Sequence, residues 1–468
     1  MFKLLFRTKS IKSIQEIEAD PEHHLKRTLS AFDLTCFGIG GIIGVGIFVI
    51  TGVAAAKFAG PGVILSFVIS MLACIFTALC YAEFAALIPV AGSAYNYSYA
   101  TLGEFLAWII GWDLVLEYVV GSIAVAIGWS GYLVSVLKVA GINVPVWCSA
   151  APGSVPGAVI NLPAAFVVLF LTVLLVRGIK ESARFTSLMV MIKLAAVVTF
   201  IVVAFPKVQP ANWHPFMPFG FNGVLTGAAI VFFAYIGFDA VSTCAEETKN
   251  PQRDLPIGII ASLVICTVLY ILVSSILTGV VSYTELNNPA PIAYALTHIG
   301  YNWGSALVSA GAVAGLTSVL VVMLMGQPRI FFSMSRDGLL WPWASKVHPK
   351  YKTPYRTQIL TGLIVATFAA FIDIGTAAEL TNIGTLFAFV LVCGGIIVLR
   401  YTQPNLPRPF KTPLVPLFPL LGIGFCAWLM VSLPQLTWIR FGVWLVIGLV
   451  IYFAYSRKHS RLAVGNSV

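Results

Sequence analysis

Long apolar stretches separated by short polar segments run through most of the chain. The five most uniform are near or above the roughly 20 residues that an α-helix needs to cross a bilayer; they are residues 62–88, 158–176, 256–280, 378–399 and 437–455. Less uniform apolar stretches occupy residues 32–59, 101–133, 185–205, 223–247, 303–333, 355–372 and 412–432. The pattern predicts an all-α membrane protein with twelve transmembrane helices.

The first of these segments contains a glycine-rich interruption. Residues 38–46 hold five glycines, each of which costs a helix roughly 1 kcal/mol relative to alanine. In hydrocarbon, every backbone group freed by such a break needs a partner, so a break persists only beside protein or a water-filled cavity. We therefore expect backbone groups of this stretch to meet a polar solute.

The sixth segment contains a second interruption. Residues 229–240 combine aromatic residues, a glycine and an acid in mid-segment, and Gly237 follows Gly44 by 193 residues. Each break opens a group of five segments, and five is odd, so the two groups run in opposite directions. Equivalent broken helices in oppositely oriented halves indicate an alternating-access transporter. Two ordinary kinked packing helices remain the alternative.

The two breaks offer complementary chemistry. The second half of the first broken helix begins near Val45, and a helix N-terminus suits an anion such as a carboxylate. Unwound carbonyls suit an ammonium group; the candidates are those of Ile42, Phe233, Ala234 and Ile236. A site that offers both is shaped for a zwitterion, which favours an α-amino acid over a sugar or a simple ion.

Composition and charge agree with a membrane location. Hydrophobic residues make up 59% and charged residues 10% of the chain, against about 25% charged in soluble domains. Most Lys and Arg residues fall on one side of the predicted spans, which places both termini in the cytoplasm by the positive-inside rule. The net charge of +10 therefore indicates topology and anionic-lipid contact rather than a nucleic-acid partner. The cysteines have no metal-binding spacing, and we expect no cofactor.

Charged residues within the membrane are further functional candidates, because a charge at mid-bilayer is costly. Lys193 has no charged neighbour within eight residues on its own helix, and burial disfavours its charged form, which makes proton exchange possible. A structural lysine bonded to carbonyls is the alternative. Asp113 and Glu117 share one face of the third span. We assign Glu117 as a second proton or substrate group, and for Asp113 we favour an interfacial hydrogen bond.

Three runs resemble the amino acid–polyamine–organocation superfamily, and within it a bacterial member of the cationic amino acid transporter branch: residues 38–48, 81–95 and 246–256. The resemblance covers residues 25–456 and implies a leucine-transporter-type 5+5 inverted repeat with two additional C-terminal helices. The expected organisation is a cytoplasmic segment (1–30), a first five-helix repeat (31–206), a second, inverted repeat (222–400), two further helices (411–456) and a cytoplasmic tail (457–468).

The resemblance also implies roles for individual residues. The substrate carboxylate would bind the backbone amides near Val45 and Gly46, and Phe233 would be the aromatic gate. Ile43 and Gly44 would also belong to the substrate-binding stretch. Lys193 would contact the first span and the hydroxyls of Thr317 and Ser318 on the eighth, as in proton-coupled members. Met323 would lie beside the substrate side chain, where its volume favours small neutral amino acids.

These observations predict a secondary active permease of the cell inner membrane that takes up L-amino acids with H⁺, small neutral ones preferred and cationic ones possible. An amino acid/polyamine exchanger and a sodium-coupled symporter remain alternatives, with a channel or a transporter-like sensor more remote. The chain lacks the HExxH, GxSxG and GxxxxGK[ST] motifs of common enzyme classes. Apart from the substrate and membrane lipids, we predict no nucleic acid and no obligate protein partner.

Overall fold

The computed structural model describes residues 7–9, 29–89, 93–177, 183–349, 351 and 353–462. Within these residues the regular structure is helical, apart from two isolated β-bridges. Most of the predicted N-terminal segment, 1–30, and the last six residues of the predicted tail lie outside the described part of the chain.

Eight segments of the described chain are long and apolar enough to cross a membrane. The main helices are α3 (Ala31–Ile42), α5 (Val63–Leu87), α7 (Glu104–Val139), α9 (Leu162–Arg177), α10 (Ala183–Ala204), α11 (Gly220–Val231), α12 (Pro251–Val280), α14 (Asn302–Arg336), α15 (Tyr355–Phe371), α16 (Ile374–Thr402), α17 (Leu417–Val431) and α18 (Gln435–Ile451). The protein is therefore a multi-pass membrane protein.

One of the eight segments, Ala31–Leu87, is 57 residues long and holds more than one helix. It is far longer than the roughly 20 residues of a single crossing. Its first helical part ends at Gly60, whose φ of +60° is left-handed, and Pro61 and Gly62 complete a short turn before α5 begins. The turn separates the first two apolar stretches that the sequence predicts.

Several helix starts follow from local sequence. Ser30 caps α3 in a capping box, because its hydroxyl accepts from the backbone N–H of Asp33 while the Asp33 carboxylate accepts from the backbone of Ser30. Asp373 caps α16 by accepting from the N–H groups of Gly375 and Thr376. Pro251 occupies the first turn of α12, where its missing N–H costs nothing.

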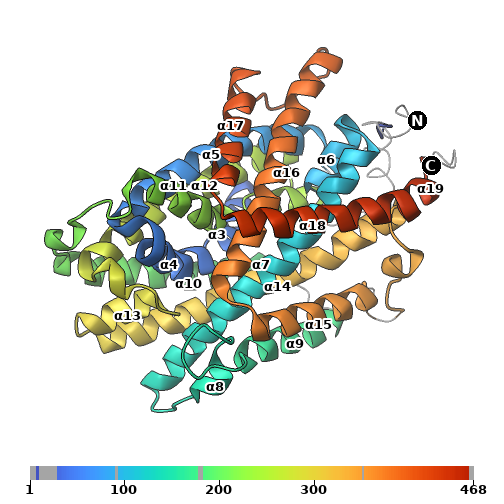
Figure 1. Ribbon diagram of the computed structural model, residues 1–468. Helices are drawn as coiled ribbons and strands as arrows, with labels where there is room; N and C mark the ends of the chain where they lie inside the picture. The colour runs from blue at the N-terminus through green and yellow to red at the C-terminus, as the bar shows by residue number, and fades with distance from the viewer. Residues whose placement is uncertain are drawn as a thin grey trace.

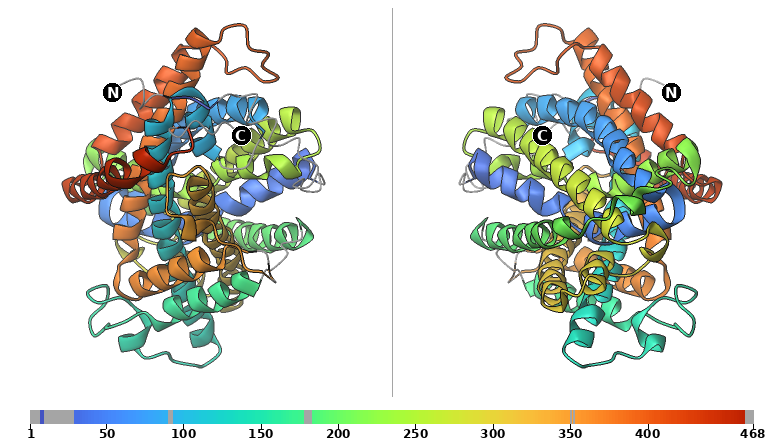
Figure 2. Two further views of the ribbon diagram at one scale, coloured as in Figure 1. Left: turned by 90° about the vertical axis from the view of Figure 1, so that its right-hand side faces the viewer. Right: turned by 90° about the vertical axis from the view of Figure 1, so that its left-hand side faces the viewer.

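The long helix α7 runs through the centre of the molecule (Figure 1). It packs against α14 and α16, and further contacts join it to α15, α9 and α18. A second group of contacts joins α12 to α3 and α5. The loops around α8 (Val146–Ser149) project at one end of the molecule, and the connection between α16 and α17 projects at the opposite end (Figure 2).

The two ends of the described chain meet. Arg7 donates a 2.6 Å hydrogen bond to the carbonyl of Leu462, and Lys9 forms a 3.1 Å ion pair with Asp337 just after α14. Ser460 donates to Glu104 at the start of α7. Both described ends therefore lie on the same side of the helices as the start of α7 and the end of α14.

Candidate functional site

The first apolar segment is interrupted at Ile43 and Gly44, inside the predicted glycine-rich break. Helix α3 ends at Ile42, and Ile43 is extended, with φ −74° and ψ 97°. Helical structure resumes with a π-helical turn, Gly46–Ile50, and π-turns often mark functional sites. Val45 therefore lies where the second half-helix begins and where N–H groups lack helical partners.

The second interruption lies at Ile236 and Gly237. After α11, a 3₁₀ turn covers Phe232–Tyr235 and a second 3₁₀ segment covers Asp239–Glu247. Gly237 has φ +120°, a backbone conformation that residues other than glycine rarely adopt. The Asp239 carboxylate accepts a 3.2 Å hydrogen bond from the N–H of Gly237, so this acid stabilises the break locally.

The two interruptions touch each other although they are far apart in sequence. A Cβ added to Gly46 would lie 2.3 Å from the Cα of Ala234, and one added to Gly237 would lie 2.7 Å from the carbonyl carbon of Gly41. Both distances are too short for any side chain. Glycine is therefore required here for close approach of two backbones, as well as for the break itself.

Tyr270 of α12 joins the two interrupted segments. Its hydroxyl lies 2.7 Å from the carbonyl of Ile42 and 2.8 Å from the carbonyl of Ala234. The ring is fully buried and packs against Phe67 and Tyr235. Two of the four carbonyls predicted to bind the substrate amine thus already share one hydroxyl. No pattern along the chain points to this residue, because a tyrosine in an apolar span is indistinguishable from a core packing residue.

Lys193 of α10 reaches the first interruption. Its fully buried ammonium group donates to the carbonyl of Gly40 and, over 3.0 Å, to the carbonyl of Ile43. Its aliphatic part lies against α14, where a Cβ added to Gly315 would come within 3.0 Å of the Lys193 Cβ. The lysine therefore links three elements at the point where α3 ends.

The expected contact of Lys193 with Thr317 and Ser318 is not among the hydrogen bonds of the described residues. The Thr317 hydroxyl donates to the carbonyl of Val313 and accepts a 2.8 Å bond from the indole of Trp129. Ser318 donates to the carbonyl of Gly315 on its own helix. Both hydroxyls thus have hydrogen-bond partners within α14, and Thr317 has a further one on α7. The Lys193 ammonium bonds to the carbonyls of the first interruption instead.

Apolar residues surround the position predicted for the side chain of the substrate. Met323 is buried, and its sulfur lies 3.1 Å from where a Cβ on Gly121 would stand. Val319, one turn earlier on α14, packs against Gly44, and Phe233 is buried. A substrate side chain beside these residues would meet hydrocarbon and a thioether.

The two acids of α7 are buried but differ in their contacts. Glu117 lies close enough to Thr385 of α16 and to Asp239 to interact with them electrostatically, while the Thr385 hydroxyl donates to the carbonyl of Thr381. Both carboxylate oxygens of Asp113 are buried without a hydrogen bond among the described residues. The interfacial hydrogen bond expected for Asp113 is therefore not found among the described residues.

The sequence profile of the amino acid permease family matches residues 29–454. The chain is 53% identical over 461 residues to the branched-chain amino acid permease BcaP of Bacillus subtilis, covering 98% of this chain and 99% of the relative. It is also 50% identical over 458 residues to the methylthioribose transporter of Bacillus subtilis, with 98% and 99% of the two chains covered. The chain belongs to the amino acid permease family.

The permease is thus a member of the amino acid–polyamine–organocation superfamily, as the three runs indicate, and it is not an enzyme. Cationic amino acid transporter relatives match at lower identity. The vacuolar cationic amino acid transporter 4 of Arabidopsis thaliana is 40% identical over 408 residues, covering 86% of this chain and 68% of the relative.

Proposed function

We propose that this permease carries neutral L-amino acids across the cell inner membrane together with protons, by alternating access. The observation that carries the proposal is the contact between Lys193 and the carbonyls of Gly40 and Ile43. It joins an exchangeable proton directly to the backbone of the interrupted helix.

The chemistry of the ammonium group gives the coupling. A protonated lysine has three donors and a full charge, and hydrogen bonds to charged donors are roughly twice as strong as neutral ones. Loss of the proton weakens the bonds to Gly40 and Ile43 and frees the end of α3 to move. Protonation of Lys193 therefore favours the interruption in its present form, and deprotonation favours its rearrangement.

The interruptions themselves bind the zwitterion. N–H groups at the start of the half-helix beyond Val45 take the carboxylate, and carbonyls at both breaks take the amine. Each carbonyl has two lone pairs, so Ile42 and Ala234 retain one after bonding to Tyr270. Because the residues at both breaks are buried, the substrate enters only when one side of the site opens.

Pairs of equivalent contacts support an inverted five-plus-five repeat within twelve spans. The contact of α3 with α12 is mirrored by that of α11 with α5, and the contact of α10 with α14 is mirrored by that of α16 with α7. Gly38 lies against Ser262 at the first contact, and Gly227 lies against Ser66 at its mirror image. We place both termini in the cytoplasm, since basic residues gather on the side where the described ends meet.

The apolar surroundings of Met323 and Val319 favour a neutral, apolar side chain over a cationic one. A neutral, apolar substrate agrees with the name of the branched-chain amino acid permease. The methylthioribose transporter, however, is almost equally similar to this chain. Methylthioribose is accordingly the second candidate substrate. It lacks the ammonium and carboxylate groups that the two interruptions are suited to bind.

Uptake into proteoliposomes tests the proposal. Purified protein should accumulate labelled leucine, isoleucine or valine when the outside is more acidic, with sodium absent, and uptake should saturate. Excess unlabelled neutral amino acids should compete, whereas arginine and methylthioribose should not. Accumulation that requires a sodium gradient, or competition by methylthioribose alone, would contradict the proposal. Flux that never saturates would indicate a channel.

A further inference from the structure

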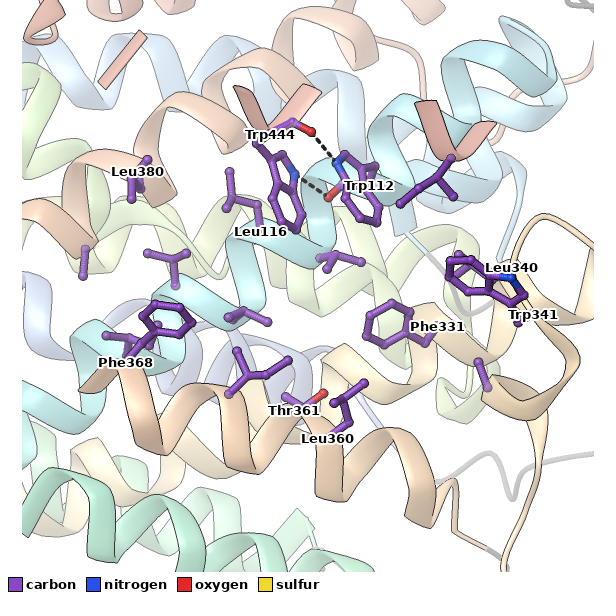
Figure 3. Close-up of a pocket in the computed structure, with 18 of the residues that line it drawn as sticks. Trp112, Leu116, Phe331, Leu340, Trp341, Leu360, Thr361, Phe368, Leu380 and Trp444 are labelled. Carbon is purple, nitrogen blue, oxygen red and sulfur yellow. Dashed lines mark hydrogen bonds between the residues drawn. The ribbon is translucent and has the colours of Figure 1, made fainter. Parts of the chain in front are cut away.

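An apolar groove that is lined by none of the residues at the two interruptions lies between α7, α15, α16 and α18 (Figure 3). Its volume is about 530 Å³, within the roughly 300–1,000 Å³ typical of ligand sites. The stacked indoles of Trp112 and Trp444, 4.3 Å apart, form part of its wall. Each indole N–H donates to the other residue's carbonyl, so this pair is fixed and needs no further partner.

The groove is open on its α15 side. Leu360, Ile364 and Phe368 follow one another at one-turn spacing along α15 and are 37%, 37% and 48% exposed. In a membrane-spanning protein this stripe faces hydrocarbon. From Leu360 to Phe368 the helix rises about 12 Å, close to the ~15 Å depth of one leaflet's hydrocarbon. The open side therefore matches the length of an acyl chain entering from one leaflet.

One polar group in the groove lacks a partner. The hydroxyl of Thr361 is buried and has no hydrogen bond among the described residues, whereas Thr367 on the same helix donates to the carbonyl one turn earlier. Thr361 lies about 9 Å along α15 from its start at Tyr355. The interfacial region of a bilayer is about 5–8 Å thick on each side, so Thr361 lies near the depth of lipid ester groups.

The end of the groove nearest the start of α15 carries aromatic and basic residues. Trp341 and Trp343 line it and are partly exposed, as expected at a membrane interface. Lys346 follows the lining residue Ala344 by two positions, and Arg356 precedes Leu360 by one turn; both are exposed. Positive charge at this rim complements a phosphate, and the inner leaflet is rich in anionic lipid.

We propose that the groove binds one anionic phospholipid. Its acyl chain lies along Leu360, Ile364 and Phe368 and fills the apolar volume. An ester carbonyl accepts the hydrogen bond of Thr361, and the phosphate lies between Lys346 and Arg356. The lipid joins α15 to α7 and α18 at a place where the protein alone leaves a gap.

Quenching of tryptophan fluorescence by brominated lipids tests the site directly, because four tryptophans line the groove. The wild-type protein is reconstituted in phosphatidylcholine that contains increasing mole fractions of dibrominated phosphatidylglycerol. Quenching should rise steeply and saturate at a low fraction. Dibrominated phosphatidylcholine with the same chains should give only a gradual, non-saturating decrease.

Two variants and a matched control locate the effect. The double variant Lys346→Gln, Arg356→Gln should lose the saturable phase, and Thr361→Val should shift its midpoint to higher lipid fractions. The control Lys138→Gln, Lys207→Gln removes two exposed charges elsewhere and should behave as wild type. Equal quenching by the two lipids in wild type, or a saturable phase that survives in the Lys346, Arg356 variant, would overturn the proposal.

Discussion

At the scale of single residues, the site depends on side chains that bond to backbone carbonyls. The Lys193 ammonium donates to the carbonyls of Gly40 and Ile43. The Tyr270 hydroxyl lies within hydrogen-bond distance of the carbonyls of Ile42 and Ala234. The lysine could be found from sequence because a charge in an apolar span is conspicuous. The tyrosine could not, since nothing along the chain reveals that its hydroxyl meets two distant breaks.

The Tyr270 hydroxyl positions the two breaks, and its removal can be tested. Tyr270→Phe keeps the ring packing on Phe67 and Tyr235 but loses the one hydroxyl proton that the carbonyls of Ile42 and Ala234 share, a hydrogen bond worth about 0.5–1.5 kcal/mol. We expect the KM for the amino acid to rise roughly three- to tenfold, with only a small fall in the unfolding temperature, because a single neutral hydrogen bond is lost. Tyr294→Phe serves as a control, because Tyr294 is a half-buried tyrosine outside the site whose hydroxyl donates to the exposed Glu285. An unchanged KM in Tyr270→Phe would show that the hydroxyl does not organise the site.

Met323 is the residue at which substrate size is tested. Met323→Ser replaces a buried thioether with a short polar group and opens space beside Gly121. We expect arginine to begin competing with labelled leucine, while leucine uptake falls. An unaltered competition profile across a panel of amino acids would remove Met323 from the pocket.

At the scale of elements, the breaks in the helices follow from glycine, but their pairing does not. The positions of both interruptions agree with the glycine-rich stretch and with Gly237. The contact of Gly46 with Ala234 depends on how two segments cross, which no local pattern encodes. The same limit explains why the expected contact of Lys193 with Thr317 and Ser318 is not found in the described part of the chain: both hydroxyls have hydrogen-bond partners elsewhere.

Gly46→Ala tests whether close contact of the two breaks is essential. The added methyl group would collide with the backbone of Ala234, and overpacking of this kind costs about 1–3 kcal/mol. We expect transport to fall by about tenfold or more. Gly442→Ala on α18 meets nothing within 4 Å and should transport as wild type. Equal activity of the two variants would contradict a tight contact.

A second element-scale test concerns the link between α5 and the connection after α16. Glu83 is buried and accepts from both Arg400, at 2.8 Å, and the backbone of Thr412, at 2.7 Å, and it pairs with Arg408. Burial lowers the pKa of the Arg408 guanidinium, while the neighbouring Glu83 carboxylate counteracts that effect.

Glu83→Gln leaves two arginines without their buried counter-charge. Breaking a buried ion pair typically costs about 3–5 kcal/mol, so the detergent-solubilised protein should unfold at a clearly lower temperature. The exposed Glu285 provides the matched control, and Glu285→Gln should unfold as wild type. If both variants unfolded at the wild-type temperature, the cluster would have no structural importance.

At the scale of the whole molecule, the chain is a multi-pass membrane protein of the amino acid permease family whose two interrupted helices meet at one buried site. Hydrophobic patterning was enough to predict a bundle of membrane helices, because length and polarity decide membrane insertion. The same patterning does not specify a substrate, because this chain shares half of its sequence or more with relatives that are named for different substrates.

The central claim is that Lys193 couples proton movement to the interrupted helix. It is tested most directly by comparing accumulation with exchange in proteoliposomes that contain wild type or Lys193→Ala. With the outside more acidic, wild type should concentrate labelled leucine, whereas the variant should only equilibrate it. Both should still exchange internal for external leucine when no pH gradient is present. Full pH-driven accumulation by Lys193→Ala would contradict the account.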